Sequence, residues 1–401
     1  MSKSIFGTSI SNDTIQTKTK DIKFIVGLDV HKKTTAITVV NKSAEKIVFK
    51  RQRLLNKDVI QTIEQFEGDK LVGMEGAYGW KWVNEALKDL SDISFVLLDA
   101  RKTSGWIKTT GVKSDKLDSE VLAYVLLHGN LNALSVYIPS KEAQENMKLL
   151  EIRDKLVSQK TQVVNQLKSI TENYGTNPFT GEIKEKSPTI QLIENNLLDQ
   201  LNFLKIQIKN VENQMNRISD NDEIIKILTS IPGIGFVSSF AFRWKVDNIS
   251  RFKDSKHLSS YFGLTVRQHQ SGDKMIKGKI SKAGNSIVRK LFVQGAQCIF
   301  NQKLLTVRWY FLNMMKEEEI NQGKSRDKHI RLKHKNKKII AVARKNMVFA
   351  YTCWKKNEYF NLDKYIQHKK DLSIKLENQI PYISSSDQYK KASNFGFVIV
   401  S

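Results

Sequence analysis

Residues 24–30 read FIVGLDV, and residues 34–40 read TTAITVV. Both are short runs rich in Ile, Val and Thr and bounded by polar residues, which is typical of buried β-strands. KIVFKRQ, at residues 46–52, follows at hairpin spacing and predicts a third strand. The chain is therefore expected to begin with three successive strands. The acidic residue Asp29 falls at the end of the first of them.

Helical and strand patterns then alternate. NKDVIQTIEQF, at residues 56–66, has helical periodicity, and Asn56 is its predicted N-cap. The later elements are predicted at residues 70–76 (KLVGMEG, strand), 80–90 (WKWVNEALKDL, helix), 93–100 (ISFVLLDA, strand) and 116–129 (KLDSEVLAYVLLHG, helix ending at Gly129). The order β-β-β-α-β-α-β-α predicts a mixed sheet flanked by helices. It matches the ribonuclease-H-like fold.

The second part of the chain is predicted to be helical. Residues 141–172 and 189–226 lack Pro and Gly and repeat Leu, Ile and Val at helical spacing, with turn residues between them. This pattern predicts a helical hairpin or coiled coil, which could be an intramolecular bundle or an oligomerisation arm. The expected organisation is a disordered tail (1–20), an α/β domain (21–140), a helical linker (141–226), a mainly α-helical domain (227–360) and an extension (361–401), whose final FGFVIV has no assignment.

Composition points to a polyanionic partner. The formal net charge is +24, with 65 Lys and Arg against 41 Asp and Glu, which favours nucleic acid or another anionic surface. The two cysteines, Cys298 and Cys353, form no CxxC pair, so zinc ribbons and disulfide scaffolds are not expected and a reducing cytoplasm fits. The polar N-terminus does not resemble a secretory signal, and the lack of long apolar runs predicts no membrane span.

Four acidic residues fall where such a fold could gather them. Asp29 and Glu75 end the first and fourth strands, which are neighbours in this fold, and Asp115 and Asp118 are spaced to share one helix face. Carboxylates this close repel without a cation, and they are ligands for Mg²⁺ or Mn²⁺. The pattern predicts a metal site acting on a phosphodiester. The alternative is four unrelated surface acids; nearby Lys113 could contact a phosphate or be solvated.

Actin-like ATPases and sugar kinases share this fold and offer another interpretation. They have a phosphate loop after the first Asp, which needs glycine for close backbone approach. Here His31, Lys32 and Lys33 occupy that place. No second Gly-rich phosphate loop follows, so this alternative is disfavoured.

Two basic or Gly-rich segments could contact phosphates. SIPGIGFVSSFAF, at residues 230–242, is similar to a helix-hairpin-helix, in which the N–H groups of Gly233 and Gly235 would face a phosphate. A turn without a ligand is the alternative. Residues 324–345 hold ten Lys or Arg against one acid, Asp327, and predict either a solvated helix or contacts along a nucleic-acid backbone.

Residues 263–296, GLTVRQHQSGDKMIKGKISKAGNSIVRKLFVQGA, contain two candidate serines. Ser271 is predicted in a loop before Gly272, and Ser281 precedes a helix. A serine needs a base or a metal to become a nucleophile, and His269 is a candidate base. Both serines could instead be structural, Ser281 as a helix cap. The candidate nucleic-acid contacts here are Lys277, Lys279, Lys282 and Arg289.

The chain resembles the DEDD-type insertion-sequence transposases, whose best-known members are bridge-RNA-guided serine recombinases. The resemblance runs from about residue 22 to about residue 356. Its motifs are GLDVHKK, GMEGAYGW, KSDKLDSEVLA, SIPGIG, FKDSKHLSSYFGLTVRQHQSG, KGKISKAGNSIVRK and KKIIAVARKNMVFAY. Their order and spacing make the resemblance specific, although single motifs such as PGIG are not.

The resemblance implies a RuvC-like N-terminal domain, a coiled-coil linker and a C-terminal transposase domain. The family's four acids correspond to Asp29, Glu75, Asp115 and Asp118, which would hold Mg²⁺. Its catalytic serine corresponds to Ser271 and would attack DNA to leave a 5′-phosphoserine. Family members assemble this site from two protomers of a tetramer. A structured RNA pairs with target and donor DNA, so base pairing specifies sequence.

The sequence departs from the family pattern beside the acids. Gly76-Ala77-Tyr78 follows Glu75 where Ala-Thr-Gly is frequent, and Ser114, Lys116 and Leu117 replace threonines around the last two aspartates. The expected function is a Mg²⁺-dependent transposase or site-specific recombinase in a prokaryotic cytoplasm, associated with the nucleoid when bound to DNA. The alternatives are a metal-dependent nuclease or junction resolvase using water, and a non-catalytic nucleic-acid-binding protein.

Overall fold

The structure is a computed structural model. It describes residues 21–42, 46–108, 115–175, 180–182, 185–271, 274–301 and 328–362. The predicted tail, Lys113, Ser114, Gly272, FGFVIV and residues 324–327 of the basic run lie outside these residues, whereas the rest of that run begins a helix at Lys328. The chain divides into two compact units between Ile138 and Pro139, and each unit is described by itself. Within the described ranges, none of the helices has the length and apolar character needed to cross a membrane.

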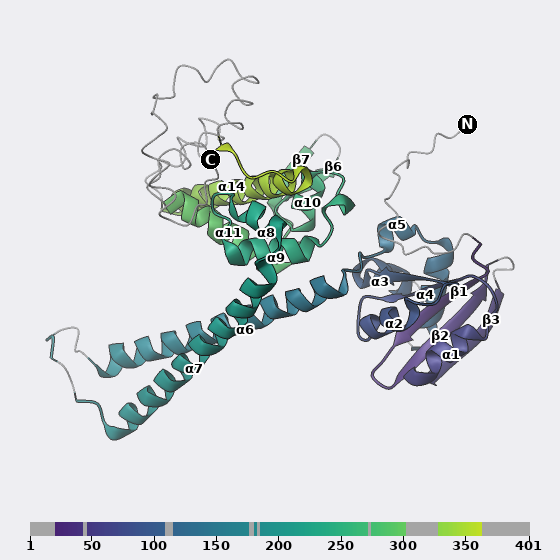
Figure 1. Cartoon of the computed structure of the whole chain (residues 1–401), viewed down its shortest axis with the longest axis horizontal. Helices are drawn as coiled ribbons and strands as arrows, with labels where there is room; N and C mark the ends of the chain where they lie inside the picture. Colours follow the sequence, from purple (N-terminus) through teal and green to yellow (C-terminus); the bar gives the residue numbers. More distant parts are fainter. Residues whose placement is uncertain are drawn as a thin grey trace, which may run out of the picture. The chain divides into compact units, whose positions relative to one another are not determined.

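The first unit is built on a five-stranded mixed sheet (Figure 1). Its strands are β1 (Phe24–Val30), β2 (Thr34–Asn41), β3 (Lys46–Leu55), β4 (Lys70–Glu75) and β5 (Ile93–Leu98). The order is β3-β2-β1-β4-β5. β1, β2 and β3 pair antiparallel, whereas β1, β4 and β5 pair parallel. The five predicted strands and the predicted pairing of the first with the fourth are confirmed.

Six helices accompany the sheet in the described part of the first unit. They are η1 (Asn56–Asp58), α1 (Val59–Glu64), α2 (Trp80–Leu87), α3 (Ala100–Lys108), α4 (Asp115–His128) and α5 (Leu131–Leu134). η1 and α1 connect β3 to β4, α2 connects β4 to β5, and α3, α4 and α5 follow β5. The predicted capping role of Asn56 is wrong, because this residue lies inside η1. Its side chain accepts a hydrogen bond from Thr35 Oγ1 (2.8 Å) and donates one to the His31 carbonyl (3.0 Å). Asn56 therefore ties the turn after β1 to β2.

The two faces of the sheet bury different apolar side chains, because successive side chains of a strand alternate. One face packs against α1 and α2 through residues such as Val26, Leu28, Val72 and Met74. The other face buries Ile25, Leu71, Val96 and Leu98 against Leu122, Val125 and Leu126 of α4. Asp29 and Glu75 are in phase with the second set, so they belong to the face that α4 covers.

The second unit begins with a long helical hairpin. α6 (Lys141–Tyr174) and α7 (Pro188–Ser219) run side by side (Figure 1). Arg153 Nη2 of α6 forms an ion pair with Glu212 Oε1 of α7 at 2.6 Å. The helix predicted over residues 189–226 is two helices, because Asp222 caps α8 (Glu223–Thr229) by accepting a hydrogen bond from the Ile225 N–H.

The rest of the second unit is mainly helical around an aromatic core. Its elements are α8, α9 (Phe236–Val246), η2 (Ile249–Arg251), α10 (Ser255–Tyr261), β6 (Val266–Ser271), β7 (Lys274–Ile280), α11 (Ser286–Asn301) and α14 (Lys328–Lys356). Phe242 lies at the centre of the core, with ring centroids 5.8 Å from Phe262 and 5.3 Å from Phe292. β6 and β7 form an antiparallel hairpin.

Candidate active site

Asp29 and Glu75 lie at the ends of neighbouring parallel strands. Leu28 of β1 is in register with Met74 of β4, and the two acids directly follow this pair. Both carboxylates therefore leave the sheet at one edge and on the α4 face. The structure thus brings together the first two predicted acids.

Helix α4 lies unusually close to this face. A Cβ added to Gly27 would sit 2.2 Å from the Ser119 carbonyl oxygen and 2.5 Å from the Ala123 nitrogen, so only glycine allows this approach. The hydroxyls of Thr38 and Ser119 form a buried hydrogen bond of 2.9 Å between β2 and α4. Asp118 immediately precedes Ser119. Close packing at Gly27 therefore holds Asp118 over the sheet near the two strand-end acids.

The electrostatics of Glu75 show that these acids influence one another. Burial raises the pKa of Glu75, and the negative charges of Asp29, Asp118 and Asp99 raise it further, while a hydrogen bond from Thr103 opposes them. Three acids from β1, β4 and α4 therefore share one electrostatic environment. Because nearby negative charges disfavour its ionised form, the Glu75 carboxylate binds a proton more readily than a free carboxylate, and the same charges attract a metal cation.

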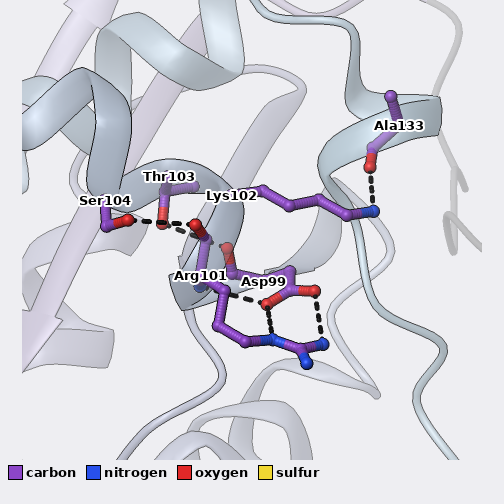
Figure 2. Close-up of polar contacts among 6 residues, drawn as sticks. All are labelled: Asp99, Arg101, Lys102, Thr103, Ser104 and Ala133. Atoms are coloured by element: carbon purple, nitrogen blue, oxygen red, sulfur yellow. Dashed lines mark hydrogen bonds and ion pairs between the residues drawn. The ribbon is translucent and has the colours of Figure 1, made fainter. Parts of the chain in front are cut away.

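Asp99 and helix α3 were not anticipated from the sequence. Asp99 follows β5, and its carboxylate accepts hydrogen bonds from Arg101 N (3.1 Å), Nε (3.1 Å) and Nη2 (3.0 Å) (Figure 2). These bonds lower the pKa of Asp99 below its usual range. An Asp before a polar helical stretch is an N-cap signal and could have indicated where α3 begins.

Thr103 of α3 links this turn to the acid site. Its fully buried hydroxyl donates to Glu75 Oε1 and lies 3.2 Å from the Asp99 carbonyl oxygen. On the other side of the site, His31 Nε2 lies 3.2 Å from Asp29 Oδ2. Glu75 and Asp29 are thus each oriented by a neighbouring polar side chain.

The donor chemistry of the site fits a hard divalent cation, because it consists of carboxylate oxygens. Among the described side chains, however, no three His, Cys, Asp or Glu residues are grouped closely enough to hold a metal ion. The Asp115 backbone begins α4, but its carboxylate lies outside the described side chains.

Ser271 lies in the second unit, at the end of the β6–β7 hairpin. It is the last residue of β6 and pairs with Lys274, so the prediction that it lies in a loop is wrong by one residue. Only residues 272 and 273 separate the two strands. His269 is in the same strand, in register with Ile276. The structure does not describe the side chains of three predicted site residues here, Ser271, His269 and Lys277.

The segment after β7 has a structural role that the sequence did not reveal. Ser281 does not cap α11; instead, Asn285 Oδ1 accepts a hydrogen bond from the Val288 N–H at 2.9 Å. Arg289 Nη1 donates to the carbonyls of Phe262 (3.2 Å) and Ala283 (2.8 Å) and so fastens this turn. Contact of Arg289 with nucleic acid stays a prediction.

The remaining predicted contacts differ in their surroundings. Lys279 and Lys282 are exposed, and Lys282 has a left-handed φ of 55°. Gly233 also has a left-handed φ, and a Cβ there would lie 2.9 Å from the Gly295 carbonyl of α11, which gives this glycine a packing role. Gly235 is the exposed N-cap of α9. A phosphate at either glycine stays a prediction.

Comparisons with known proteins give the class first. A family model of DEDD-type transposases matches residues 26–175, and a model described as Transposase IS116/IS110/IS902 family matches residues 225–309. The first match includes Asp29, Glu75, Asp115 and Asp118, and the second includes Ser271. These two matches place the chain among the transposases.

Curated relatives point to the same group. The transposase for insertion sequence element IS1111A of Coxiella burnetii is 25% identical over 70% of this chain and 78% of its own length. The transposase for insertion sequence element IS1328 of Yersinia enterocolitica is 23% identical over 70% and 84%. A probable family 20 transposase of Pseudomonas aeruginosa is 23% identical over 71% and 87%. The chain belongs to the DEDD-type insertion-sequence transposases of the IS110 group. Membership of this family implies an enzyme that cleaves and rejoins DNA strands and that uses a divalent metal ion.

Proposed function

We propose that this chain is a Mg²⁺-dependent transposase, also active with Mn²⁺, that cuts DNA through a covalent serine intermediate. The observation that carries the proposal is the shared environment of Asp29, Glu75 and Asp118, which come from three elements and meet on one sheet face. Asp115, one helical turn before Asp118, completes the proposed ligand set. When bound, the cation neutralises charge that develops on the phosphate oxygens.

In the proposed step, Ser271 Oγ attacks a DNA phosphorus atom. The new Oγ–P bond forms as the bond from phosphorus to the 3′ oxygen breaks, and the leaving 3′ oxygen takes up a proton from solvent, which gives a 5′-phosphoserine and a free 3′ hydroxyl. The serine proton passes to a base, for which His269 is the candidate on the same strand. Rejoining reverses these bonds on the exchanged strand. The four acids hold the cation, and Thr103 orients Glu75.

The proposed assembly is an oligomer, a dimer to a tetramer, built on a RuvC-like first domain and the α6–α7 hairpin. Support comes from apolar side chains that the hairpin leaves exposed: Ile152, Leu192, Ile193, Leu198, Phe203 and Ile206. The net charge of +24 supports contact with nucleic acid. A structured guide RNA, proposed from the family resemblance, would select DNA sites by base pairing.

The test is a search for a covalent protein–DNA adduct. The full-length protein is incubated with its element-end DNA, the flanking transcript and Mg²⁺, then denatured and separated by gel electrophoresis. An adduct that is lost in Ser271→Ala and kept in the matched control Ser281→Ala supports the mechanism. Loss of the adduct in both serine variants, or its persistence in Ser271→Ala, contradicts it. Full strand cleavage by Asp118→Asn would contradict the metal site.

A hydrolytic nuclease or junction resolvase is the second candidate. It is favoured by one observation: Asp29, Glu75 and Asp118, together with Thr103, which donates a hydrogen bond to Glu75, all belong to the first unit. In this case, water attacks the phosphodiester in place of Ser271. Metal-dependent cleavage without an adduct, unchanged in Ser271→Ala, would establish this alternative.

A further inference from the structure

Two large aromatic side chains are exposed just after Glu75. Tyr78 and Trp82 are 45% and 68% exposed. Their ring centroids are 5.8 Å apart and the rings are nearly perpendicular. Tyr78 lies in the turn that follows β4, and Trp82 lies in the first turn of α2. They therefore form one exposed pair, which we call the aromatic pair.

Packing of α2 does not account for Trp82. The apolar face of this helix consists of Trp80, Val83 and Leu87, which contact the sheet core. These positions follow the spacing of a single helix face. Trp82 lies outside this stripe, and its neighbour Lys81 is also exposed. The most exposed tryptophan among the described side chains thus faces solvent from a helix that is already anchored by other residues.

The aromatic pair lies at the same sheet edge as the acids, on the side of the sheet that α2 covers, whereas Asp29 and Glu75 belong to the face that α4 covers. Gly79, between the two rings, has a left-handed φ of 80°, and a Cβ there would lie 2.8 Å from Val30 Cγ1. Val30 directly follows Asp29. The Trp82 N–H donates to the Gly79 carbonyl at 3.0 Å, and the Gly76 N–H donates to the Leu98 carbonyl at 2.9 Å. These contacts fix the turn against the ends of β1 and β5.

The chemistry of this surface suits an unpaired nucleobase. The face of an aromatic ring stacks on any base, whereas paired bases inside a duplex are already stacked. Lys81 is also exposed; its ammonium lies 5.8 Å from the centroid of the neighbouring Trp80 ring and can attract a phosphate. Cutting and exchanging strands separates bases close to the reacting phosphodiester. We propose that Tyr78 and Trp82 form a stacking platform for an unpaired DNA base at the sheet edge that carries the acid site. This deepens the proposed function and rests on its assignment of DNA as the substrate.

The test compares single-stranded and duplex DNA of one sequence, with affinity measured by fluorescence anisotropy on the full-length protein. We expect Trp82→Ala to weaken single-strand binding about tenfold and to leave duplex binding within about twofold of wild type. Tyr78→Ala should act in the same direction, and Trp82→Phe should retain most of the affinity because it keeps a ring. The matched control is Trp106→Ala, which removes another exposed tryptophan of the first unit, 44% exposed on α3.

Three results would overturn the platform. Unchanged single-strand affinity in both alanine variants would do so, as would equal loss for duplex and single strand. A change in oligomeric state for Trp82→Ala, measured by sedimentation velocity, would assign the pair to a contact with a second copy of the chain. Each variant is first checked by circular dichroism. If the wild-type protein forms the Ser271 adduct but the binding test fails, only the platform proposal is contradicted. If the adduct does not form, the proposed function is contradicted.

Discussion

The sheet edge that carries Asp29 and Glu75 and the β6–β7 hairpin that carries Ser271 differ in how tightly they are packed. At the sheet edge, β1 and β4 are covered on both faces, and α4 is pressed against Gly27. The hairpin has only two strands, and Val266, Arg267 and Lys279 are exposed along it. A two-stranded ribbon is adaptable by itself. If the proposed function holds, the acids proposed to bind the metal are held in place before DNA arrives, whereas the proposed nucleophile is carried on a part that can adjust.

The largest effect should come from removing one acid. Glu75→Gln is expected to lower strand cleavage at least about 1000-fold, equivalent to about 4 kcal/mol of barrier, because a ligand of the cation is lost. Mn²⁺ binding, followed by electron paramagnetic resonance, should weaken too. Ser271→Ala should lose cleavage equally but keep Mn²⁺ binding. Equal Mn²⁺ affinity in Glu75→Gln and wild type would contradict the proposal that the acids bind the cation while Ser271 is the nucleophile.

The rigidity of the sheet edge can be tested at Gly27. Gly27→Ala should lower the free energy of unfolding by about 3 kcal/mol, because the new Cβ meets the backbone of α4. Urea unfolding measures the loss. The matched control is Gly105→Ala in α3, where a Cβ would meet no described atom within 4 Å. That control should be neutral or more stable by about 1 kcal/mol, and similar losses in both variants would contradict tight packing at Gly27.

Two carboxylates of the first unit should respond to pH with opposite sign. The pKa of Glu75 is raised above its usual 4.5, so in the absence of metal its contribution to stability falls as pH rises from about 4.5 through the folded-state pKa. The pKa of Asp92 is lowered below 3.8 by Lys70, so its contribution is present above about pH 4 and is lost as pH falls through the folded-state pKa.

Melting in EDTA between pH 3 and pH 7 checks both signs. Glu75→Gln should raise the melting temperature by about 2–4 °C at pH 7, because it removes a repelling charge. Asp92→Asn should lower it at pH 7 and converge with wild type in acid. A lower melting temperature for Glu75→Gln at pH 7 would contradict the repulsion.

The smallest effect is expected in the hairpin. Arg267 Nη2 donates to the Ser281 carbonyl at 2.9 Å, at the end of the β6–β7 hairpin opposite the connection at residues 272 and 273. Arg267→Ala should lower stability by only about 1 kcal/mol while it speeds hydrogen exchange in β6 and β7. A protection pattern unchanged from wild type would show that the hairpin is as rigid as the sheet edge.

The sequence predicted the sheet well because its strands are buried and rich in Ile and Val, and β1 was delimited to the residue. It missed α3, ARKTSGWIK, because Gly105 and a polar composition hide the helical pattern, and the anchoring bonds of Asp99 are a matter of three-dimensional structure. Asn56 was misassigned because its partner, Thr35, is distant in sequence.

The placement of Asp29 and Glu75 at neighbouring strand ends was predictable, whereas the residues around them were not. Spacing placed Asp29 and Glu75 on neighbouring strands, whereas the approach of α4 over Gly27 and the hydrogen bond from Thr103 depend on packing between distant segments. The environment of Ser271 stays a prediction, since its side chain lies outside the described part.

The Thr103 hydroxyl has one hydrogen and two acceptors within reach, the Glu75 carboxylate and the Asp99 carbonyl. It can satisfy only one of them at a time. A charged Glu75 draws the hydrogen towards itself, whereas a neutralised Glu75 releases it to the first turn of α3. We therefore expect the amide exchange rates in the first turn of α3 to depend on the charge of Glu75, even in the absence of DNA.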